Sequence, residues 1–394
     1  MHIFLHDYAG HPFQTLLSRE LATRGYTVTH IYFAGDQGPK GDFVRRRGDP
    51  EGLVFKGLSL GWEYSKSNFF KRRQGDVEYG RLVEREILLA KPDIVISGNT
   101  PTEAQKYILR AAQNAGSKFV YWIQDFYSVA ASKILKAKIP LVGELIGRYY
   151  MYMERRQLIQ SDAVIAITEA FLPQLNAWGV GRGRVAIIPN WGAIEDINCE
   201  QQPTQWQINN GYKDQKLILY SGTLALKHNP ELLVSLAKSN TSYRVVVVAA
   251  GVGVDYLRQR IIEDKLDNID LLPLQPFNVF SEVLGAATLL VGVIERDAGE
   301  YSVPSKVLSY LCAGRPILLA APSDNLASCL IRESSAGFVV EPEDILGFGA
   351  AAKKLLSDHC EVTWRNGRIY AENNFKIDRV ADKFELVISK LVRN

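Results

Sequence analysis

The sequence predicts an α/β protein made of two halves, each a parallel sheet with helices on its faces. Residues 2–33 show the pattern strand, helix, strand, which is how a parallel sheet opens. The same alternation begins again at residues 217–231, after a polar stretch at residues 194–211. With 394 residues, the chain is long enough for two domains of ordinary size. We therefore expect a domain boundary near residues 189–192, Pro-Asn-Trp-Gly.

The remaining elements follow from apolar runs bounded by glycine, proline and polar residues. In the first half, strands are expected at 2–6, 26–33, 93–97, 118–123, 163–167 and 185–188, and helices at 14–24, 102–115 and 142–159. In the second half, strands are expected at 217–220, 245–250, 269–272, 289–294 and 317–321, with a last helix at 374–392. Residues 36–76 look irregular.

Composition limits the class of protein and of partner. Hydrophobic residues make up 47% of the chain and charged residues 23%, which is usual for a soluble globular protein. A net charge of +3 is too small to indicate nucleic acid. The four cysteines have no paired spacing, so neither a zinc site nor a disulfide framework is expected, and a reducing cytoplasm fits. Without a signal-like or membrane-spanning run, we predict a cytoplasmic protein and leave peripheral membrane contact open.

The stretch from Glu295 to Pro316 carries the clearest functional pattern. An acidic loop containing Glu295 and Glu300 follows an apolar strand, and Pro304-Ser305-Lys306 then favours a helix start. Free backbone amides at a helix N-terminus, together with a lysine, form an anion site. Gly314 ends the helix. The arrangement predicts a site for a sugar joined to a diphosphate.

Two glycine turns follow strands in the second half. After residues 217–220, a turn with Gly222 and Thr223 precedes Lys227, which suits a diphosphate. After residues 245–250, Gly251 permits close approach of the backbone to a ligand, although a single Gly-x-Gly is weak support.

The helix beginning at Pro304 and the Ala-Gly-Arg-Pro after it resemble the donor segment of retaining GT-B glycosyltransferases of family 4, most of all the bacterial branch that makes surface polysaccharides such as O-antigen and colanic acid. The resemblance implies two Rossmann-like domains facing each other across a cleft. Residues 1–190 would bind the acceptor, residues 191–374 would bind the nucleotide sugar, and a last helix, 375–394, would cross back to the first domain. It also implies metal-independent transfer with retention of configuration.

The resemblance assigns roles to particular residues. In the family, the glycine loop holds the donor phosphates, which matches Gly222, Thr223 and Lys227 here, while Gln275 and Pro276 fall where relatives contact the base. The family carries two glutamates in the donor segment, and this chain departs from that pattern. Its counterparts are Ser309, which could bond a ribose hydroxyl, and Tyr301. Glu300 or Glu295 would then serve near the sugar, and the choice between them stays open.

Acceptor-side candidates follow strands of the first half. Gly10 and His11 lie in the first strand-to-helix loop, and His11 either meets an acceptor or bonds locally. Asn99 and Thr100 follow another strand, where ligands bind and where helix caps also occur. Asp125, after a third strand, is expected to position or deprotonate the acceptor hydroxyl.

Two segments are candidates for membrane contact. Residues 40–73 carry nine Lys/Arg against four acids, and with the aromatic residues of 36–76 they fit either a flap for anionic lipid or a solvated loop. Residues 142–159 form a basic amphipathic pattern that can lie on a membrane, but we expect its apolar side to pack on the core.

Three functions remain open from the sequence. The first is a glycosyltransferase using a nucleotide sugar, with UDP favoured over GDP or dTDP, and a saccharide acceptor that is lipid-linked. The second is a nucleotide-sugar 2-epimerase of the same architecture, which needs no acceptor. The third is a binding protein without catalysis, favoured by Ser309 in place of a glutamate. The Asp-x-Asp loop of metal-dependent transferases is absent, so no metal cofactor is expected.

Overall fold

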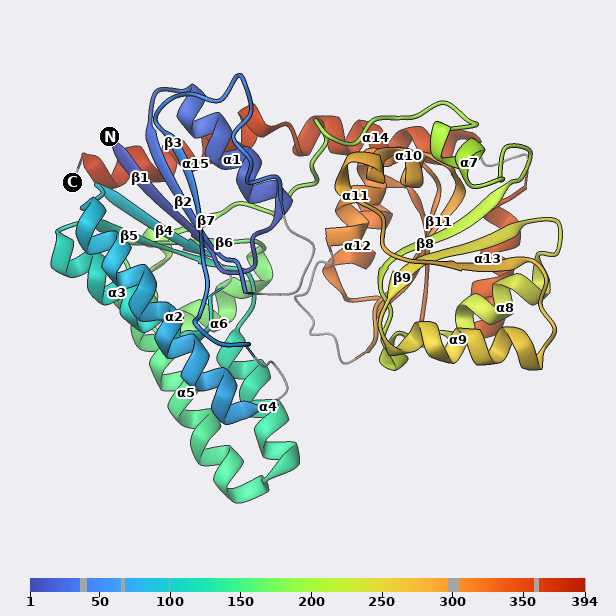
Figure 1. Ribbon diagram of the computed structural model, residues 1–394. Helices are drawn as coiled ribbons and strands as arrows, with labels where there is room; N and C mark the ends of the chain where they lie inside the picture. The colour runs from blue at the N-terminus through green and yellow to red at the C-terminus, as the bar shows by residue number, and fades with distance from the viewer. Residues whose placement is uncertain (36–40, 65–67, 99, 297–304, 358–360, 394) are drawn as a thin grey trace. The chain divides into compact units, whose positions relative to one another are not determined.

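The computed structural model describes residues 1–394 except 36–40, 65–67, 99, 297–304, 358–360 and 394. The chain divides into two compact units. Unit 1 comprises residues 1–190 together with 377–394, and unit 2 comprises residues 191–376. Each unit is a parallel sheet with helices on both faces, which confirms the predicted α/β class (Figure 1).

Unit 1 is built on a seven-stranded sheet in the order β3-β2-β1-β4-β5-β6-β7, with every recorded pairing parallel. Its strands are β1 (His2–Asp7), β2 (Thr27–Phe33), β3 (Leu53–Leu58), β4 (Ile94–Gly98), β5 (Lys118–Ile123), β6 (Ala163–Ala166) and β7 (Val185–Ile187). Its main helices are α1 (Pro12–Thr23), α2 (Phe69–Ala90), α3 (Thr102–Ala115), α4 (Tyr127–Lys138), α5 (Pro140–Gln160), α6 (Leu172–Ala177) and α15 (Ile377–Val392). Central strands such as β4 are buried along their whole length, as continuous apolar runs require.

Unit 2 is built on a six-stranded parallel sheet in the order β10-β9-β8-β11-β12-β13. Its strands are β8 (Leu217–Thr223), β9 (Arg244–Ala250), β10 (Ile269–Leu272), β11 (Ala287–Val293), β12 (Ile317–Ala320) and β13 (Gly337–Val340). Its helices are α7 (Gln205–Asn209), α8 (Glu231–Ser239), α9 (Val252–Glu263), α10 (Phe280–Gly285), α11 (Ser305–Ala313), α12 (Leu326–Ser334), α13 (Ile345–Leu355) and α14 (Glu361–Asn374).

Several elements lie outside the expectation, among them β13 at the edge of the second sheet. Residues 36–76 are not irregular throughout, because they contain β3 and the start of α2. The sequence hides β3 because, as an edge strand, only its two end residues, Leu53 and Leu58, are buried, so no continuous apolar run is needed. At the other end of the chain, the last predicted helix is preceded by a separate helix, α14, that the sequence pattern did not reveal.

The last helix, α15, packs against α1 and belongs to unit 1 although the chain reaches it from unit 2. Arg24 donates hydrogen bonds to Asp382 Oδ1 at 2.6 Å, to the Glu385 carboxylate and to the carbonyl oxygen of Asp378 at 2.7 Å. Phe384 is fully buried and its ring meets that of Trp122 edge to face, with 5.0 Å between the centroids. These contacts fix α15 on unit 1.

In both units the order of the strands creates one switch point. The chain of unit 1 leaves β1 toward β2 and β3 on one side and returns to β4 on the other. The chain of unit 2 does the same at β8 and β11. In open parallel sheets, ligands bind beyond the carboxyl ends of the two strands at such a point, because the loops diverge there. Among the described residues, no helix is long and apolar enough to cross a membrane.

We predict that Phe384→Ala lowers the free energy of unfolding of unit 1 by about 3–5 kcal/mol, because it removes a fully buried ring and leaves a cavity beside Trp122. Urea unfolding followed by tryptophan fluorescence would measure the loss, with unit 1 and unit 2 treated as separate transitions. Leu386→Ala is the matched control, because Leu386 lies on the same helix with 62% of its surface exposed. Equal stability of the two variants would show that α15 is not held by this packing.

Candidate functional site

The switch point of unit 2 brings together three segments that are distant in sequence. β8 and β11 are hydrogen-bonded neighbours, with Tyr220 opposite Val291. The helix α11 begins at Ser305 and carries Lys306 in its first turn. The carboxyl end of β8 and the start of α11 therefore lie beside each other at the predicted ligand edge of the sheet.

Lys306 is held over an aromatic ring at this edge. Its ammonium nitrogen lies 4.2 Å from the centroid of the Tyr220 ring and donates a hydrogen bond to Tyr220 Oη at 2.8 Å. The Tyr220 hydroxyl in turn donates to the carbonyl oxygen of Thr223 at 2.7 Å. Withdrawal from water lowers the pKa of Lys306 to about 8, and the negative charge of Glu295 offsets only part of that effect. The lysine is thus fixed in position rather than extended into solvent.

A second tyrosine fixes the helix that carries Lys306. Tyr310 is fully buried on α11, and its hydroxyl oxygen accepts a hydrogen bond from the backbone N–H of Ser221 at 3.0 Å. The same hydroxyl can donate to the carbonyl oxygen of Val291 at 3.2 Å. Because Ser221 is on β8 and Val291 is on β11, Tyr310 joins α11 to both strands of the switch point.

The turn after β8 adds a second positive charge. Lys227, in the short 3-10 helix η3 (Leu226–His228), forms an ion pair and hydrogen bond with Glu295. His228 Nε2 lies 3.2 Å from the other oxygen of that carboxylate. Burial by itself would raise the pKa of Glu295, but the hydrogen bond from Lys227 outweighs it and holds the pKa below its usual range. Glu295 therefore anchors the turn through both side chains.

The protonation state of His228 follows from its partners. Its Nδ1 accepts a hydrogen bond from the backbone N–H of Ala225 at 3.0 Å, so in the neutral ring the proton is on Nε2, which faces Glu295. Burial is the main cause that lowers the pKa of His228, and the nearby lysines act in the same direction. His228 is a neutral donor to Glu295 near pH 7.

The two glycines singled out in the sequence have backbone conformations that side chains rarely adopt. Gly222 has φ of +129°, and a Cβ there would lie 3.4 Å from Cε and Nζ of Lys306. Gly251 has φ of +118°, and a Cβ there would collide with the backbone of Leu224. Gly222 therefore leaves the space beside the ammonium group of Lys306 open. At position 251 a glycine is required because a side chain would collide with the backbone of Leu224.

The other donor-side candidates have roles within unit 2. Ser309 donates its hydroxyl to the carbonyl oxygen of Ser305 at 3.2 Å, one turn earlier on α11. The Gln275 side chain accepts from Trp206 Nε1 at 3.2 Å and donates to the carbonyl oxygen of Pro273 at 2.9 Å. Pro276 precedes a short 3-10 helix, residues 277–279. Glu300 and Pro304, like Asn99 of the first half, lie outside the described residues.

In unit 1, the loop after β1 is organised by a buried carboxylate. Asp7 has no exposed surface and accepts hydrogen bonds from the backbone N–H groups of Ala9, at 3.2 Å, and of His11. His11 Nδ1 lies 3.3 Å from Asp7 Oδ1, and 30% of the His11 side chain is exposed. Burial would raise the pKa of Asp7, but His11 holds it below its usual range. Gly10 makes the loop possible with φ of +73°.

Of the two roles predicted for His11, the structure shows the local bond. His11 precedes Pro12, the first residue of α1, but its side chain makes no capping hydrogen bond to the helix. Instead it pairs with Asp7. An aspartate that orients an accessible imidazole is an arrangement that can move a proton.

The second polar cluster of unit 1 is a buried chain of hydrogen bonds that runs from Tyr79 to Gln105. Tyr79 donates to His6 Nε2 at 2.9 Å, and His6 Nδ1 lies 3.0 Å from Ser97 Oγ, which donates to Gln105 at 2.6 Å. Burial lowers the pKa of His6 to about 3, so the ring is neutral. Thr100 lies at the edge of this chain, 7% exposed, and donates its hydroxyl to the carbonyl oxygen of Gly98 at 3.0 Å. By contrast, Asp125 is exposed after β5.

The comparisons with known proteins bear on both units. Residues 11–191 match the family described as glycosyl transferase 4-like domain. The chain is 26% identical over 306 residues to WcaI of Escherichia coli K12, named as a colanic acid biosynthesis glycosyl transferase, with 75% of this chain and 73% of that protein covered.

Solved structures extend the likeness to the whole chain. Sucrose-phosphate synthase of Thermosynechococcus elongatus has a TM-score of 0.74 at 13% identity, covering 100% of this chain and 99% of that one. HepE of Anabaena, in complex with UDP and glucose, has a TM-score of 0.71 at 14% identity, covering 99% and 100%. The chain has the GT-B fold. The domain match covers the first half of the chain, and the likeness to WcaI and the shared fold extend over most or all of it.

Several residues that organise the switch points of unit 1 and unit 2 were not predicted from the sequence. Tyr220 and Tyr310 resembled ordinary core aromatics, because a strand and an apolar helix face gave no sign of a shared partner. His228 and Asp7 were visible in the turns but had no predicted role. The one available signal was the placement of Asp7 directly at the end of a buried strand.

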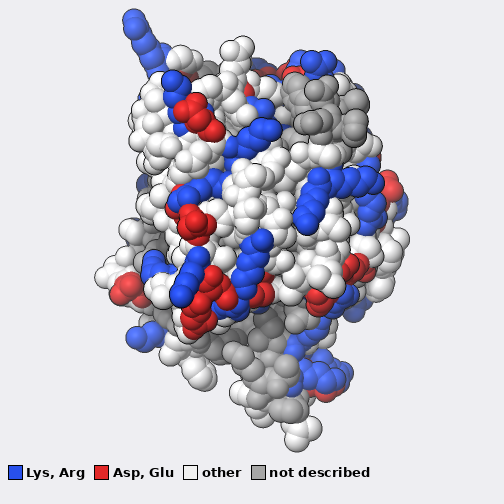
Figure 2. Space-filling view, turned by 90° about the vertical axis from the view of Figure 1, so that its right-hand side faces the viewer, with Lys and Arg blue, Asp and Glu red and all other residues white. Residues whose placement is uncertain are grey.

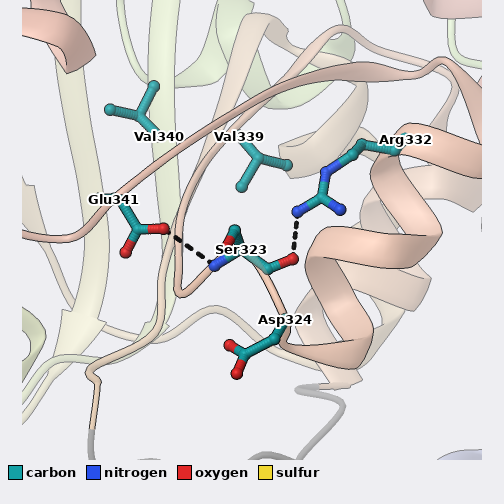
Figure 3. Close-up of a pocket in the computed structure, with 6 residues that line it drawn as sticks. All are labelled: Ser323, Asp324, Arg332, Val339, Val340 and Glu341. Atoms are coloured by element: carbon teal, nitrogen blue, oxygen red, sulfur yellow. Dashed lines mark hydrogen bonds between the residues drawn. The ribbon is translucent and has the colours of Figure 1, made fainter.

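A hollow of about 480 Å³ lies elsewhere on unit 2 (Figure 3). It is lined by Ser323, Asp324, Arg332, Val339, Val340 and Glu341, from the loop after β12, from α12 and from the end of β13. The backbone N–H of Ser323 donates to Glu341 at 3.1 Å, and Arg332 donates to the carbonyl oxygen of Ser323. None of the predicted site residues lines it. Within the described ranges, no group of three or more His, Cys, Asp or Glu side chains is placed to hold a metal ion.

We predict that inorganic pyrophosphate binds more weakly as pH rises through about 8, with about a tenfold loss of affinity between pH 7 and pH 9. The reason is that Lys306 binds an anion only while its amine is protonated. Isothermal titration calorimetry across this range would measure the change. In Lys306→Arg the guanidinium stays charged, so the loss near pH 8 should vanish, whereas Lys213→Arg, an exposed control in unit 2, should behave as the wild type. The same pH profile in all three proteins would exclude Lys306 as the titrating group.

Proposed function

We propose that this chain is a retaining, metal-independent glycosyltransferase that moves a sugar from a nucleotide diphosphate to a saccharide acceptor. The observation that carries the proposal is Lys306, whose ammonium is fixed by Tyr220 at the switch point of unit 2, beside the open backbone of Gly222. A half-buried cation at the N-terminus of a helix is disfavoured by the helix dipole unless an anion is bound. A donor diphosphate removes that conflict.

The chemistry that this edge supplies is charge stabilisation. When the sugar leaves, negative charge grows on the diphosphate, and a fixed ammonium in a partly desolvated site stabilises that charge without reorganising. Lys306 is the principal group, with the backbone amide of Ser305 beside it. Lys227 is 65% exposed and paired with Glu295, so we propose that it exchanges this partner for a donor phosphate. Glu295 would then face the sugar, as would Glu300.

We propose UDP as the nucleotide of the donor. Support comes from the likeness to HepE of Anabaena, whose structure contains UDP and glucose. The Gln275 side chain is engaged with Trp206 and Pro273, so contact with the base would come from the backbone near Gln275 and Pro276. Ser309 retains acceptor lone pairs for a ribose hydroxyl, since its own proton is directed to Ser305.

On the acceptor side, we propose that His11 receives or shares the proton of the attacking hydroxyl while Asp7 orients the imidazole. The carboxylate of Asp7 is fully buried and contacts the ring of His11, and the His11 side chain is accessible to solvent. Asp125, exposed after β5, and Asn99 would contribute to acceptor binding. Thr100 fits a structural role better, because its hydroxyl is bonded to Gly98 within the sheet edge. The proposed acceptor is a lipid-linked saccharide.

We predict that Lys306→Ala lowers kcat by about 100-fold, because one preorganised group for the developing charge is lost. The thermal shift caused by UDP should shrink in the same variant, whereas a ligand at a hundred times its Kd adds about 2.7 kcal/mol of stability to the wild type. Lys213→Ala is the matched control, since Lys213 is an exposed lysine of unit 2. Unchanged melting of the unliganded variant would show that its fold is intact, and near-normal turnover would refute the role of Lys306.

The products separate the proposed transferase from the two other functions. We predict that UDP release requires an acceptor, continues in excess chelator, and gives a glycoside of the same anomeric configuration as the donor. Proton NMR of the product and UDP release with and without EDTA would measure this. Epimerised nucleotide sugar without acceptor would identify an epimerase. Binding of UDP-sugar without any product, under all acceptors tried, would identify a binding protein, and loss of turnover in EDTA would show a metal requirement.

A further inference from the structure

The helical hairpin formed by α4 and α5 carries a concentration of exposed apolar side chains. Of the 24 large apolar side chains that are exposed in the described part of the chain, eight fall within residues 127–160. Six of them are on α5, at Leu141, Val142, Leu145, Tyr149, Tyr152 and Ile159. Apolar surface gathered in this way marks an interaction site, whereas single exposed apolar residues are ordinary. The prediction that the apolar side of this helix packs on the core is wrong for these six side chains.

The exposed side chains form one stripe. Positions 142, 145, 149 and 152 repeat at intervals of three and four, which places them on one face of α5. The opposite face is used within unit 1, where Tyr150 and Leu158 are buried. The helix therefore has two apolar faces, of which the structure covers one.

The hairpin is packed firmly, so the exposed stripe is not a consequence of loose packing. A Cβ on Gly143 would collide with the backbone of Leu135, and one on Gly147 would collide with Ser132, so the two glycines let α4 and α5 approach closely. At the base of the hairpin, the fully buried Glu154 accepts hydrogen bonds from the backbone N–H groups of Tyr127 and Ser128, at 3.2 and 3.1 Å. In Figure 1 the hairpin projects away from the sheet of unit 1.

The charge of the hairpin indicates which kind of partner would bind the exposed apolar stripe. Residues 127–160 contain six Lys or Arg and two acids, of which one, Glu154, is buried. Arg148 and Arg156 are exposed, and their spacing places them on the same side of α5 as Tyr149 and Tyr152. The face of unit 2 shown in Figure 2 is different, since Lys/Arg and Asp/Glu lie beside one another there. A basic apolar face attracts an anionic partner and repels a second copy of itself.

The order of residues along α5 matches the layers of a bilayer interface. Leu141, Val142 and Leu145 lie nearest the hairpin turn, Tyr149 and Tyr152 come next, and the arginines lie among and beyond them. Tyrosine rings prefer the headgroup level, and arginines reach the phosphates while their stems cover apolar surface. The aliphatic part covers about 6 Å of helix at 1.5 Å per residue, within the about 5–10 Å that interfacial segments are immersed.

We propose that the α4–α5 hairpin docks unit 1 on an anionic lipid surface, with Leu141, Val142 and Leu145 in the acyl boundary and Arg148 and Arg156 on the headgroup phosphates. Asp125 lies two residues before α4, so it is about 18 Å from the hairpin turn along a helix of 12 residues. The inference rests on the hairpin alone and does not require the proposed transfer reaction.

Co-sedimentation of the full chain with vesicles tests the proposal. The wild type should bind vesicles made of equal parts phosphatidylglycerol and phosphatidylcholine, and bind pure phosphatidylcholine at least tenfold more weakly. Leu141→Ser combined with Leu145→Ser should weaken binding to the mixed vesicles at least tenfold. Ile262→Ser combined with Leu346→Ser is the matched control, because it removes two equally exposed apolar side chains of unit 2 and should bind as the wild type.

Charge is tested in the same way. Arg148→Gln with Arg156→Gln should weaken binding to the mixed vesicles about tenfold or more and leave binding to phosphatidylcholine unchanged, while Lys213→Gln with Lys353→Gln should have no such effect. Equal binding by the hairpin and control variants would overturn the proposal. So would sedimentation velocity showing that the wild type self-associates through the hairpin, since the occupant would then be a second copy. The UDP-induced thermal shift should be the same in all variants, which separates this test from that of the donor site.

Discussion

The arrangement of unit 2 depends on holding one ammonium group partly out of water. Lys306 loses hydration, and among the described residues three features compensate: the face of Tyr220, the hydroxyl of the same ring and the charge of Glu295. An exposed lysine at a helix start would relax into solvent, but this one is fixed because Tyr310 joins its helix to both strands of the switch point. Under the proposed function a donor phosphate would balance this charge, and Gly222 leaves the space beside the ammonium group open.

The two units carry different polar side chains at the corresponding edges of their sheets. Each places its polar groups beyond the carboxyl ends of the two strands where the sheet order reverses, β8 and β11 in one case and β1 and β4 in the other. Unit 2 presents lysines there, which suits a diphosphate. Unit 1 presents an aspartate–histidine pair, which suits proton transfer from a hydroxyl. The fold supplies the position, and the side chains at each edge supply the chemistry.

The hairpin of unit 1 departs from the prediction that the apolar side of residues 142–159 packs on the core. The sequence pattern of residues 142–159 contains both a core face and an exposed face, and a single amphipathic period cannot tell two apolar faces apart. Gly143 and Gly147 decide the matter, because they bring α4 against α5 and so turn the stripe of Leu145, Tyr149 and Tyr152 outward. Burial of Glu154 at the base then fixes the helix in that rotation.

The sequence by itself determined the α/β class, the central buried strands and the segments in which a ligand edge would form. It did so because continuous apolar runs, glycine turns and a proline-led helix start are local signals. Tertiary structure alone decided the partners: Tyr220 under Lys306, and Glu295 between Lys227 and His228. It also decided that β3 is a strand, since an edge strand needs few buried residues. Such contacts join residues up to 86 positions apart, and no local pattern records which distant side chain a strand order will bring alongside.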